Sequence, residues 1–273
     1  MKKAIVVISD LHVGSTSGLC PAEGIDLDEK DHYTPSRFVQ EMHRVWELFW
    51  KFNAEQCKGI KNRSLVINGD LVDGVHHNTV AVATSNIMLQ EDAAGDILKP
   101  ICKNFDRVFV TRGTEAHVGQ SAQSDERIAK EIKAEIDQDT GKYSRWQLWL
   151  DVDDVVFNIA HHIGVTSSAA YESSAVMREM VAALVEAGQW GQKLPDVIVR
   201  SHRHRYIMLG IPSAKGLIQA VVTPGWQLRS PYVERIDRMR LPHVGGVIFI
   251  VENNRCQVIE KIYPMKIPQM VNI

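Results

Sequence analysis

Residues 4–12 read Ala-Ile-Val-Val-Ile-Ser-Asp-Leu-His, an apolar run that ends abruptly in a serine, an aspartate and a histidine. The apolar part is rich in β-branched residues, which predicts a short strand that is buried on both faces. Residues i and i+2 of an extended segment point the same way, so Asp10 and His12 can share one ion. The segment therefore predicts a buried strand that delivers two metal-binding side chains at its end.

The same arrangement, a short apolar strand followed by polar residues of the kind that bind metals, recurs four times along the chain. The predicted strands cover residues 64–68, 107–111, 155–160 and 196–200. They are followed by Gly69-Asp70-Leu71-Val72-Asp73, Gly113-Thr114-Glu115-Ala116-His117, His161-His162 and His202-Arg203-His204. Six of the eleven histidines lie in these five places, so imidazoles and carboxylates are concentrated at strand ends.

The chemistry of these residues favours a catalytic metal site. Carboxylate and imidazole ligands without thiolates suit manganese, iron, zinc, cobalt or nickel in a catalytic site better than they suit a structural zinc. Five segments supply too many ligands for one ion, whereas they suit two neighbouring ions with one bridging carboxylate. The sequence therefore predicts two divalent metal ions as cofactors, with manganese as the first choice.

The order of the predicted elements indicates an α/β (α+β) fold. Strands and helices alternate in the first half, with helices expected from Pro35 to Phe52, over Thr79–Leu98 and over 124–136. The second half is rich in strands, with a hairpin over 146–160, one helix over 169–186 that Gly188 ends, and strands at 206–210, 216–222, 244–251 and 257–262. This pattern predicts a two-sheet β-sandwich flanked by helices. No linker divides the chain, so we expect a single domain over residues 1–273.

Composition excludes several classes of protein. The chain has 273 residues, 45% of them apolar and 23% charged, with a formal net charge of -2. This balance argues against a whole-surface nucleic-acid binder and leaves room for a local basic patch. No apolar run approaches the ~20 residues of a membrane span, and the run after Met1-Lys2-Lys3 is too short for a signal peptide. We therefore expect a soluble, cytoplasmic protein with no membrane partner.

The order of these motifs resembles that of the calcineurin-like metallophosphoesterase family. Asp-x-His, Gly-Asp-x-x-Asp, a glycine-led loop with histidine, a lone histidine and His-x-His follow one another between residues 9 and 204. The family hydrolyses phosphate monoesters or diesters at a dinuclear centre, and its two-sheet architecture also fits the trailing strands. The resemblance implies that Asp70 bridges both metals and that the other ligands are Asp10, His12 and His204 for the first metal and His161 and His202 for the second.

The third motif departs from the family pattern, which is Gly-Asn-His followed by an acid. Here the loop has no asparagine, and His117 lies four residues after Gly113 rather than two. We expect His117 to act as the general acid or to contact the phosphate. The missing oxygen ligand then comes from Glu115, from Thr114 or from water, and Glu115 is preferred because a carboxylate binds a divalent cation better than a hydroxyl does. Alternatively, Glu115 only braces the loop through a hydrogen bond.

Several neighbouring residues have alternative roles. Asp73 is expected to support the site by hydrogen bonding rather than to bind a metal. His162 is the alternative to His161 as a ligand. His76 and His77 are expected to be solvent-facing residues at a helix start, with substrate contact as the alternative.

Arginines beside the motifs bear on the substrate. Arg112 and Arg203 are the predicted substrate-binding residues, because arginine binds phosphate in a bidentate manner. A second group favours a nucleic acid or nucleotide if it folds over the metals, and is a solvated loop otherwise; it consists of Arg229, Arg235, Arg238, Arg240, Trp226, Tyr232 and His243. The predicted function is metal-dependent phosphoester hydrolysis with a slight preference for phosphodiesters. The alternatives are a phosphomonoesterase and a catalytically weak metal-binding scaffold.

Overall fold

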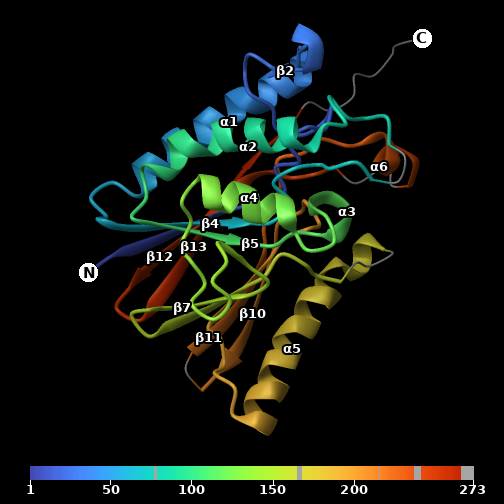
Figure 1. Ribbon diagram of the computed structural model, residues 1–273. Helices are drawn as coiled ribbons and strands as arrows, with labels where there is room; N and C mark the ends of the chain where they lie inside the picture. The colour runs from blue at the N-terminus through green and yellow to red at the C-terminus, as the bar shows by residue number, and fades with distance from the viewer. Residues whose placement is uncertain (77–78, 165–167, 215, 237–240, 266–273) are drawn as a thin grey trace, which may run out of the picture.

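The computed structural model describes residues 1–76, 79–164, 168–214, 216–236 and 241–265, and it contains two main sheets with helices on their outer sides (Figure 1). The six-stranded sheet has the order β13 (Arg255–Tyr263), β12 (Val244–Glu252), β1 (Lys3–Ile8), β4 (Asn62–Asn68), β5 (Arg107–Thr111) and β6 (Ser144–Arg145). The five-stranded sheet has the order β10 (Ile207–Ser213), β11 (Gly216–Val222), β9 (Val197–Arg200), β8 (Val155–Ile159) and β7 (Leu148–Val152). The predicted two-sheet α/β sandwich flanked by helices is therefore confirmed.

The helices lie on both outer faces of the sandwich. Three of them pack on the six-stranded sheet, namely α1 (Arg37–Gln56), α2 (Ile87–Cys102) and α4 (Gln123–Glu131). Helix α5 (Glu172–Trp190) packs on the five-stranded sheet. The short elements are β2 (Ile25–Asp26), η1 (Asp28–Lys30), β3 (His32–Tyr33), α3 (Glu115–Val118), η2 (Ala169–Tyr171) and α6 (Pro231–Ile236). Within the described ranges, the search for a helix with the length and apolar character of a membrane span finds none.

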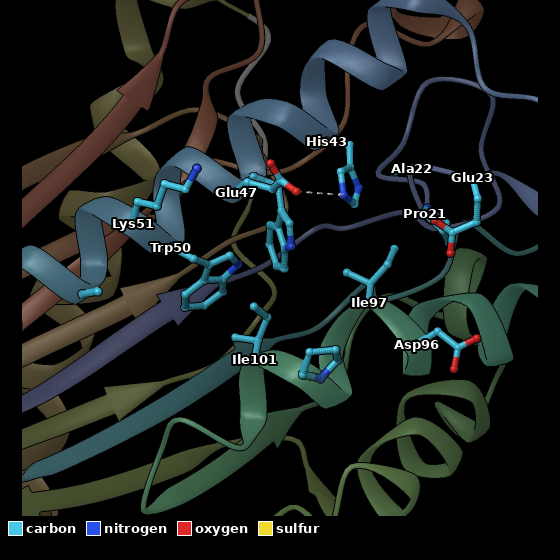
Figure 2. A pocket seen from close by; sticks show the side chains of 13 residues that line it. Pro21, Ala22, Glu23, His43, Glu47, Trp50, Lys51, Asp96, Ile97 and Ile101 are labelled. Carbon is cyan, nitrogen blue, oxygen red and sulfur yellow. Dashed lines mark ion pairs between the residues drawn. The ribbon is translucent and has the colours of Figure 1, made fainter.

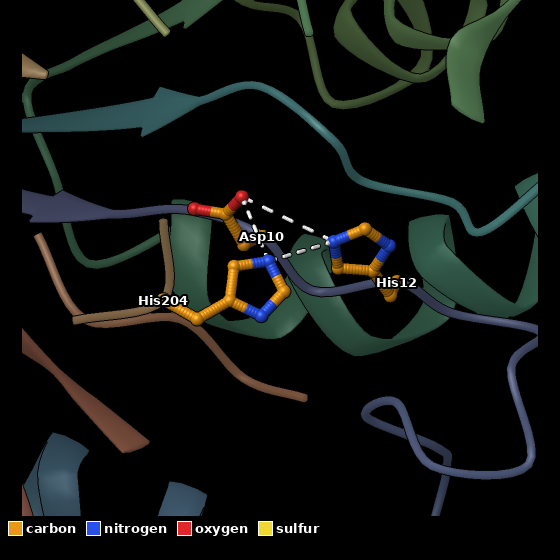
Figure 3. A group of neighbouring side chains, drawn as sticks. All are labelled: Asp10, His12 and His204. Carbon is orange, nitrogen blue, oxygen red and sulfur yellow. Dashed lines mark hydrogen bonds and ion pairs between the residues drawn. The ribbon is translucent and has the colours of Figure 1, made fainter. Parts of the chain in front are cut away.

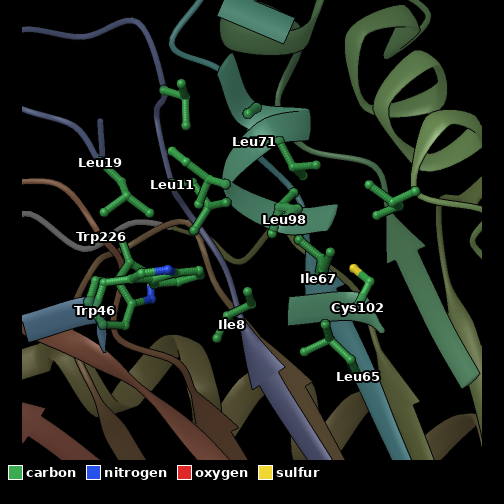
Figure 4. Packing of buried hydrophobic residues seen from close by; sticks show 14 of the residues in the cluster. Ile8, Leu11, Leu19, Trp46, Leu65, Ile67, Leu71, Leu98, Cys102 and Trp226 are labelled. Carbon is green, nitrogen blue, oxygen red and sulfur yellow. The ribbon is translucent and has the colours of Figure 1, made fainter. Parts of the chain in front are cut away.

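Strand β1 shows how the sequence builds these layers. Its side chains alternate between the two faces of the sheet, as the period of a strand requires. Val6 and Ile8 belong to the core beneath the helices, whereas Ile5 and Val7 belong to the core between the two sheets. Figure 4 shows the first of these cores, in which Ile8 packs near residues of α1 and α2. Both faces of β1 are buried, as the apolar run predicts.

Some predicted helix boundaries are wrong. Helix α2 begins at Ile87 rather than at Thr79, because Asn86 caps it and accepts a hydrogen bond from the Met88 N–H at 3.1 Å. Helix α5 continues through Gly188 and ends before Gly191, whose left-handed φ of 68° suits a glycine after a helix. Glycine inside an exposed helix costs only about 1 kcal/mol relative to alanine, which packing can offset.

Candidate metal centre

The five polar segments meet at one edge of the sandwich, where the parallel strands β1, β4 and β5 and the parallel pair β8 and β9 end. Backbone hydrogen bonds join the loops to one another. The Asp10 N–H donates to the Gly69 carbonyl at 3.0 Å, and the His12 N–H donates to the Asp70 carbonyl at 3.1 Å. In the other sheet, the Ser201 N–H donates to the His161 carbonyl at 2.8 Å. Hydrogen bonds thus join loops that lie far apart in the sequence.

One group of possible metal ligands consists of Asp10, His12 and His204 (Figure 3). The Nε2 atoms of His12 and His204 lie 3.1 Å apart, and His204 Nε2 lies 3.2 Å from Asp10 Oδ1. Asp10 and His12 are almost completely buried. Two imidazole nitrogens and a carboxylate oxygen that converge in this way form a suitable set of ligands for a divalent cation.

A second group consists of Asp70, His161 and His202. His161 Nε2 lies 3.0 Å from Asp70 Oδ2, and His202 Nδ1 lies 4.0 Å from the same oxygen. His161 Nδ1 lies 2.6 Å from the Asn68 carbonyl, which orients the ring toward Asp70. His162 is exposed and stacks on His202, so the structure brings His161 into the group in preference to His162.

The two groups adjoin, since His161 Nε2 lies 3.9 Å from Asp10 Oδ1. Among the described residues, neither of these buried atoms makes a hydrogen bond, although Asp70 Oδ2 lies 3.0 Å from His161 Nε2 and His204 Nε2 lies 3.2 Å from Asp10 Oδ1. Buried polar atoms without hydrogen bonds are costly, and a cation between these two would satisfy both. The residues present therefore fit divalent metal ions. Each group takes residues from loops of both sheets, with His204 joining Asp10 and His12 in the first group.

The backbone is strained at five of the predicted ligands. Their φ angles lie in the left-handed region: 55° at Asp10, 45° at His12, 54° at Asp70, 70° at His202 and 50° at His204. The expectation that Asp10 and His12 lie on an extended segment is thus wrong, because the chain turns sharply after β1. Non-glycine residues held in this region are concentrated at functional sites.

Close packing also requires glycine in two of the motifs. A Cβ atom on Gly113 would lie 2.1 Å from Asp70 Oδ1, and one on Gly69 would lie 2.6 Å from His161 Nδ1. Gly69 has, in addition, a φ of 79°, which favours glycine. Gly113 thus lets the third loop approach the Asp70 carboxylate, and Gly69 lets the His161 ring pack against the loop that carries Asp70.

The electrostatics of the cluster favour charged carboxylates. Burial disfavours the ionised forms of Asp10 and Asp70, but the nearby His204 and His161 imidazoles outweigh it and hold the pKa of both carboxyls below its usual value. Burial lowers the pKa of His161, yet Asp70 and Asp10 together raise it to about 10. Burial and the neighbouring His161 lower the pKa of His202 to about 4, which leaves that imidazole neutral.

Asp73 lies behind His12, as a supporting residue would, and it also forms a group of possible ligands with His76 and His117. Its Oδ1 atom lies 3.0 Å from His12 Nδ1 and accepts a hydrogen bond from Gln227 Nε2 at 3.2 Å. A carboxylate behind an imidazole fixes its orientation and leaves the other ring nitrogen for an ion. His76 lies on the other side, with Nε2 3.6 Å from Asp73 Oδ2, in a segment without helix; His77 lies outside the described residues.

The third loop differs from the prediction at Glu115. Glu115 is exposed at the start of α3, and no group of possible ligands found in the described ranges includes it. The preceding residue takes the contact instead: the Thr114 N–H donates to Asp70 Oδ1 at 2.7 Å, and its hydroxyl lies 3.0 Å from Asp70 Oδ2. The preference for Glu115 as the oxygen ligand is therefore corrected, because the turn of helix that begins there directs it to the surface.

His117 reaches the cluster, as the sequence predicts. Its ring centroid lies 4.4 Å from that of His12, and it forms a group of possible ligands with His12 and Asp70. Its Nδ1 atom lies 2.7 Å from the Asp73 carbonyl, which orients the ring and leaves Nε2 for a proton, an ion or a substrate. Burial and the nearby His12 lower the pKa of His117 to about 4.

The predicted substrate-binding arginines are held by other residues. Arg112 donates from Nε to Ser144 Oγ at 3.0 Å, and its guanidinium carbon lies 5.1 Å from the Trp146 ring centroid. Arg203 donates from Nη1 to the Glu172 carbonyl at 2.8 Å. Their predicted role therefore stays a prediction.

Trp226, from the second arginine-rich group, does not stack on a substrate. It is completely buried and packs edge-on against Trp46 of α1, with ring centroids 4.8 Å apart (Figure 4). Arg229 pairs with Glu234 at 3.2 Å. Arg238 and Arg240 lie outside the described residues.

A network of buried polar side chains, which the sequence does not predict, lies beneath the cluster. Thr111 donates to Asn68, which donates to Ser201 Oγ at 2.5 Å. Thr223 Oγ1 lies 2.7 Å from the hydroxyls of both Ser201 and Ser9. The only signal in the sequence is that polar residues end or follow otherwise apolar strands. This hydrogen-bonded network connects the loops of the two sheets.

Asp125 also supports the site, although the sequence does not predict this role. Its Oδ2 atom accepts from the Gly113 N–H at 2.7 Å, and its Oδ1 atom accepts from the Leu71 N–H at 3.3 Å. Burial, together with the Asp70 carboxylate, raises the pKa of Asp125 to about 7. Asp125 thus ties together the two loops that surround Asp70.

We expect Asp125→Ala to lower the free energy of unfolding by about 2–4 kcal/mol, because it leaves two buried N–H groups without acceptors. Asp139→Ala, in an exposed turn, is the matched control and should change stability by less than about 0.5 kcal/mol. Urea denaturation measures both. Equal stabilities of the two variants would contradict the bracing role of Asp125.

The grouping also predicts how metal binding responds to loss of one histidine. His204 belongs to the first group and His202 to the second, so each single alanine variant should lose mainly one metal ion. The measurement is metal content per chain by mass spectrometry after dialysis. If each variant loses both ions together, the division into two groups is wrong.

Two pockets bear on where a ligand can bind. A pocket of about 780 Å³ adjoins the cluster and is lined by His76, Thr114, Glu115, Gln120, Trp146 and His162. A second, of about 600 Å³, lies between α1 and α2 and contains Trp50 and Ile97 (Figure 2). Among the described residues that line this second pocket, none belongs to either group of possible ligands. Chemistry at the cluster therefore concerns the first pocket.

Comparison with known proteins gives distant likenesses only. No protein-family model and no curated protein matches the sequence. A Thermotoga maritima protein solved by solution NMR is 11% identical, with 96% of this chain and 99% of that chain covered and a TM-score of 0.37. A metallophosphoesterase from Sphaerobacter thermophilus is 10% identical, with 96% and 89% covered and a TM-score of 0.35. At these values the likenesses do not decide the activity, which has to be argued from the side chains.

Proposed function

We propose that the protein hydrolyses phosphate esters at a centre of two divalent metal ions. One observation supports this above all: two adjoining sets of possible ligands each contain a buried atom that makes no hydrogen bond, Asp10 Oδ1 in one and His161 Nε2 in the other. A single structural ion would not require six converging ligands. Carboxylate and imidazole ligands also agree with manganese as the first choice.

Different residues of the site would have different roles in this reaction. Asp10, His12 and His204 would hold one ion, His161 and His202 the other, and Asp70 both. When bound, such ions polarise phosphoryl oxygens and bring the pKa of a water molecule toward neutrality. Asp73 keeps His12 in position, and Asp125 and Thr114 keep the third loop against Asp70. We expect His117, whose Nδ1 atom is held by the Asp73 carbonyl, to give a proton to the leaving group.

We propose a phosphodiester or nucleotide as the substrate, with phosphomonoesters as the second choice. The pocket beside the second group supports this preference, because it offers room for an organic substituent next to the possible metal ligands. The test compares turnover of bis-p-nitrophenyl phosphate with that of p-nitrophenyl phosphate, with added Mn²⁺ and with EDTA. Faster turnover of the diester, lost in EDTA, is the expected result. Bound metal without turnover of either ester would identify a non-catalytic scaffold instead.

A further inference from the structure

The pocket beside the second group of possible ligands is connected to that group through two of its walls. On one wall, Gly113 and Thr114 line the pocket and also touch the Asp70 carboxylate. On the other, His162 lines the pocket and stacks on His202 with ring centroids 5.1 Å apart. A molecule in the pocket therefore adjoins Asp70 and His202.

Trp146 gives this pocket its chemical character. Its side chain is 57% exposed although it is a large apolar ring, and it lines the pocket. The Arg112 guanidinium lies over the ring at 5.1 Å, and Ser144 holds that guanidinium in turn. Trp146 is thus a ring fixed in place beside the cluster, while Trp226, the tryptophan that the sequence favours for stacking, is buried in the core.

The remaining walls suit a flat ring with polar edges. Glu115 is exposed on the pocket wall and offers a carboxylate acceptor, and Gln120 offers an amide that can both donate and accept. Every nucleobase has a π face for stacking and at least one N–H on its edge for such an acceptor. The volume of about 780 Å³ lies in the ordinary range for small-molecule sites.

We propose that this pocket binds the base of a nucleotide substrate, stacked on Trp146, while the phosphate lies beside the metal ion that Asp70, His161 and His202 would hold. The inference rests on the proposed phosphoesterase function and adds the residues that bind the base. It also gives Glu115 a role at the base rather than at a metal ion.

The test uses two diesters that share one leaving group, thymidine 5′-(p-nitrophenyl phosphate) and methyl p-nitrophenyl phosphate. We expect Trp146→Ala to lower kcat/KM for the thymidine ester by about 5- to 100-fold, the range for loss of one base–aromatic stack, and to leave the methyl ester unchanged. Trp146→Phe should restore most of the loss. Trp149→Ala, a half-exposed tryptophan on β7 outside the pocket, is the matched control. Equal losses on both esters would overturn the proposal.

A binding measurement separates this inference from the proposed function. Isothermal titration calorimetry with thymidine 5′-monophosphate is carried out on Mn²⁺-loaded wild-type protein and on Trp146→Ala. If neither ester is hydrolysed, the phosphoesterase proposal fails, whereas weaker binding to Trp146→Ala still supports the base pocket. Equal binding of thymidine 5′-monophosphate to wild type and Trp146→Ala, or binding to neither protein, overturns the base-pocket proposal.

Discussion

Asp70→Asn is expected to reduce turnover of bis-p-nitrophenyl phosphate at least about a thousandfold, because metal ions supply several kcal/mol of transition-state stabilisation and each 1.36 kcal/mol is tenfold in rate. The Asp70 carboxylate lies near His161, His202, His12 and Thr114 at once. Asparagine has almost the same volume but no charge, so metal content per chain should fall as well.

The fold itself should survive this substitution. An asparagine oxygen can still accept the hydrogen bond from the Thr114 N–H, so thermal unfolding in EDTA should resemble that of the wild type. Asp73→Asn is the matched comparison and should be milder, since residues that orient a ligand typically cost about 10–100-fold. Near-normal turnover by Asp70→Asn would rule out the two-metal proposal.

His117→Ala is expected to slow turnover by about 10²–10⁴-fold on diesters with poor leaving groups, the range for loss of a general acid. The effect should be small for p-nitrophenolate, which leaves without a proton. Both metal ions should stay bound, because Asp10, His12 and His204 and the second group around Asp70 are complete without His117.

Two measurements check the role of His117. Turnover rates of wild type and His117→Ala on a series of aryl esters show how the loss depends on the pKa of the leaving group. Metal analysis of the variant shows whether the ions remain bound. A uniform loss across the series would contradict the acid role. Loss of metal from His117→Ala would instead assign the imidazole to the ligands.

The sequence predicts the features that depend on the pattern of residues within a short segment. Strand β1 is predictable because five apolar residues end in polar ones, and both faces of a strand in mid-sheet are buried. The ligand positions are predictable because parallel strands bring their carboxyl ends to one edge of a sheet. The residues between Thr79 and Asn86 show the limit, because their apolar pattern continues that of α2 while the Asn86 cap begins the helix later.

Features that depend on tertiary packing are not predictable in this way. Trp226 and Trp146 are the same residue type near polar sequence, yet one docks against Trp46 and the other stays exposed. Glu115 fails as a ligand because a single helical turn forms at that residue, which its composition does not indicate. Asp125 braces two loops that only the folded chain brings together.

That both sheets contribute to each group of possible ligands has a consequence for how the protein is made. His204 has to meet Asp10 and His12, which left the ribosome almost two hundred residues earlier, about three quarters of the chain. Such long-range contacts form late in folding, after the loop-closure entropy has been overcome. A nascent chain therefore cannot assemble either set before β9 has docked beside β8. Any ion that binds afterwards would join one sheet to the other, as a late cross-link between the two sheets of the sandwich.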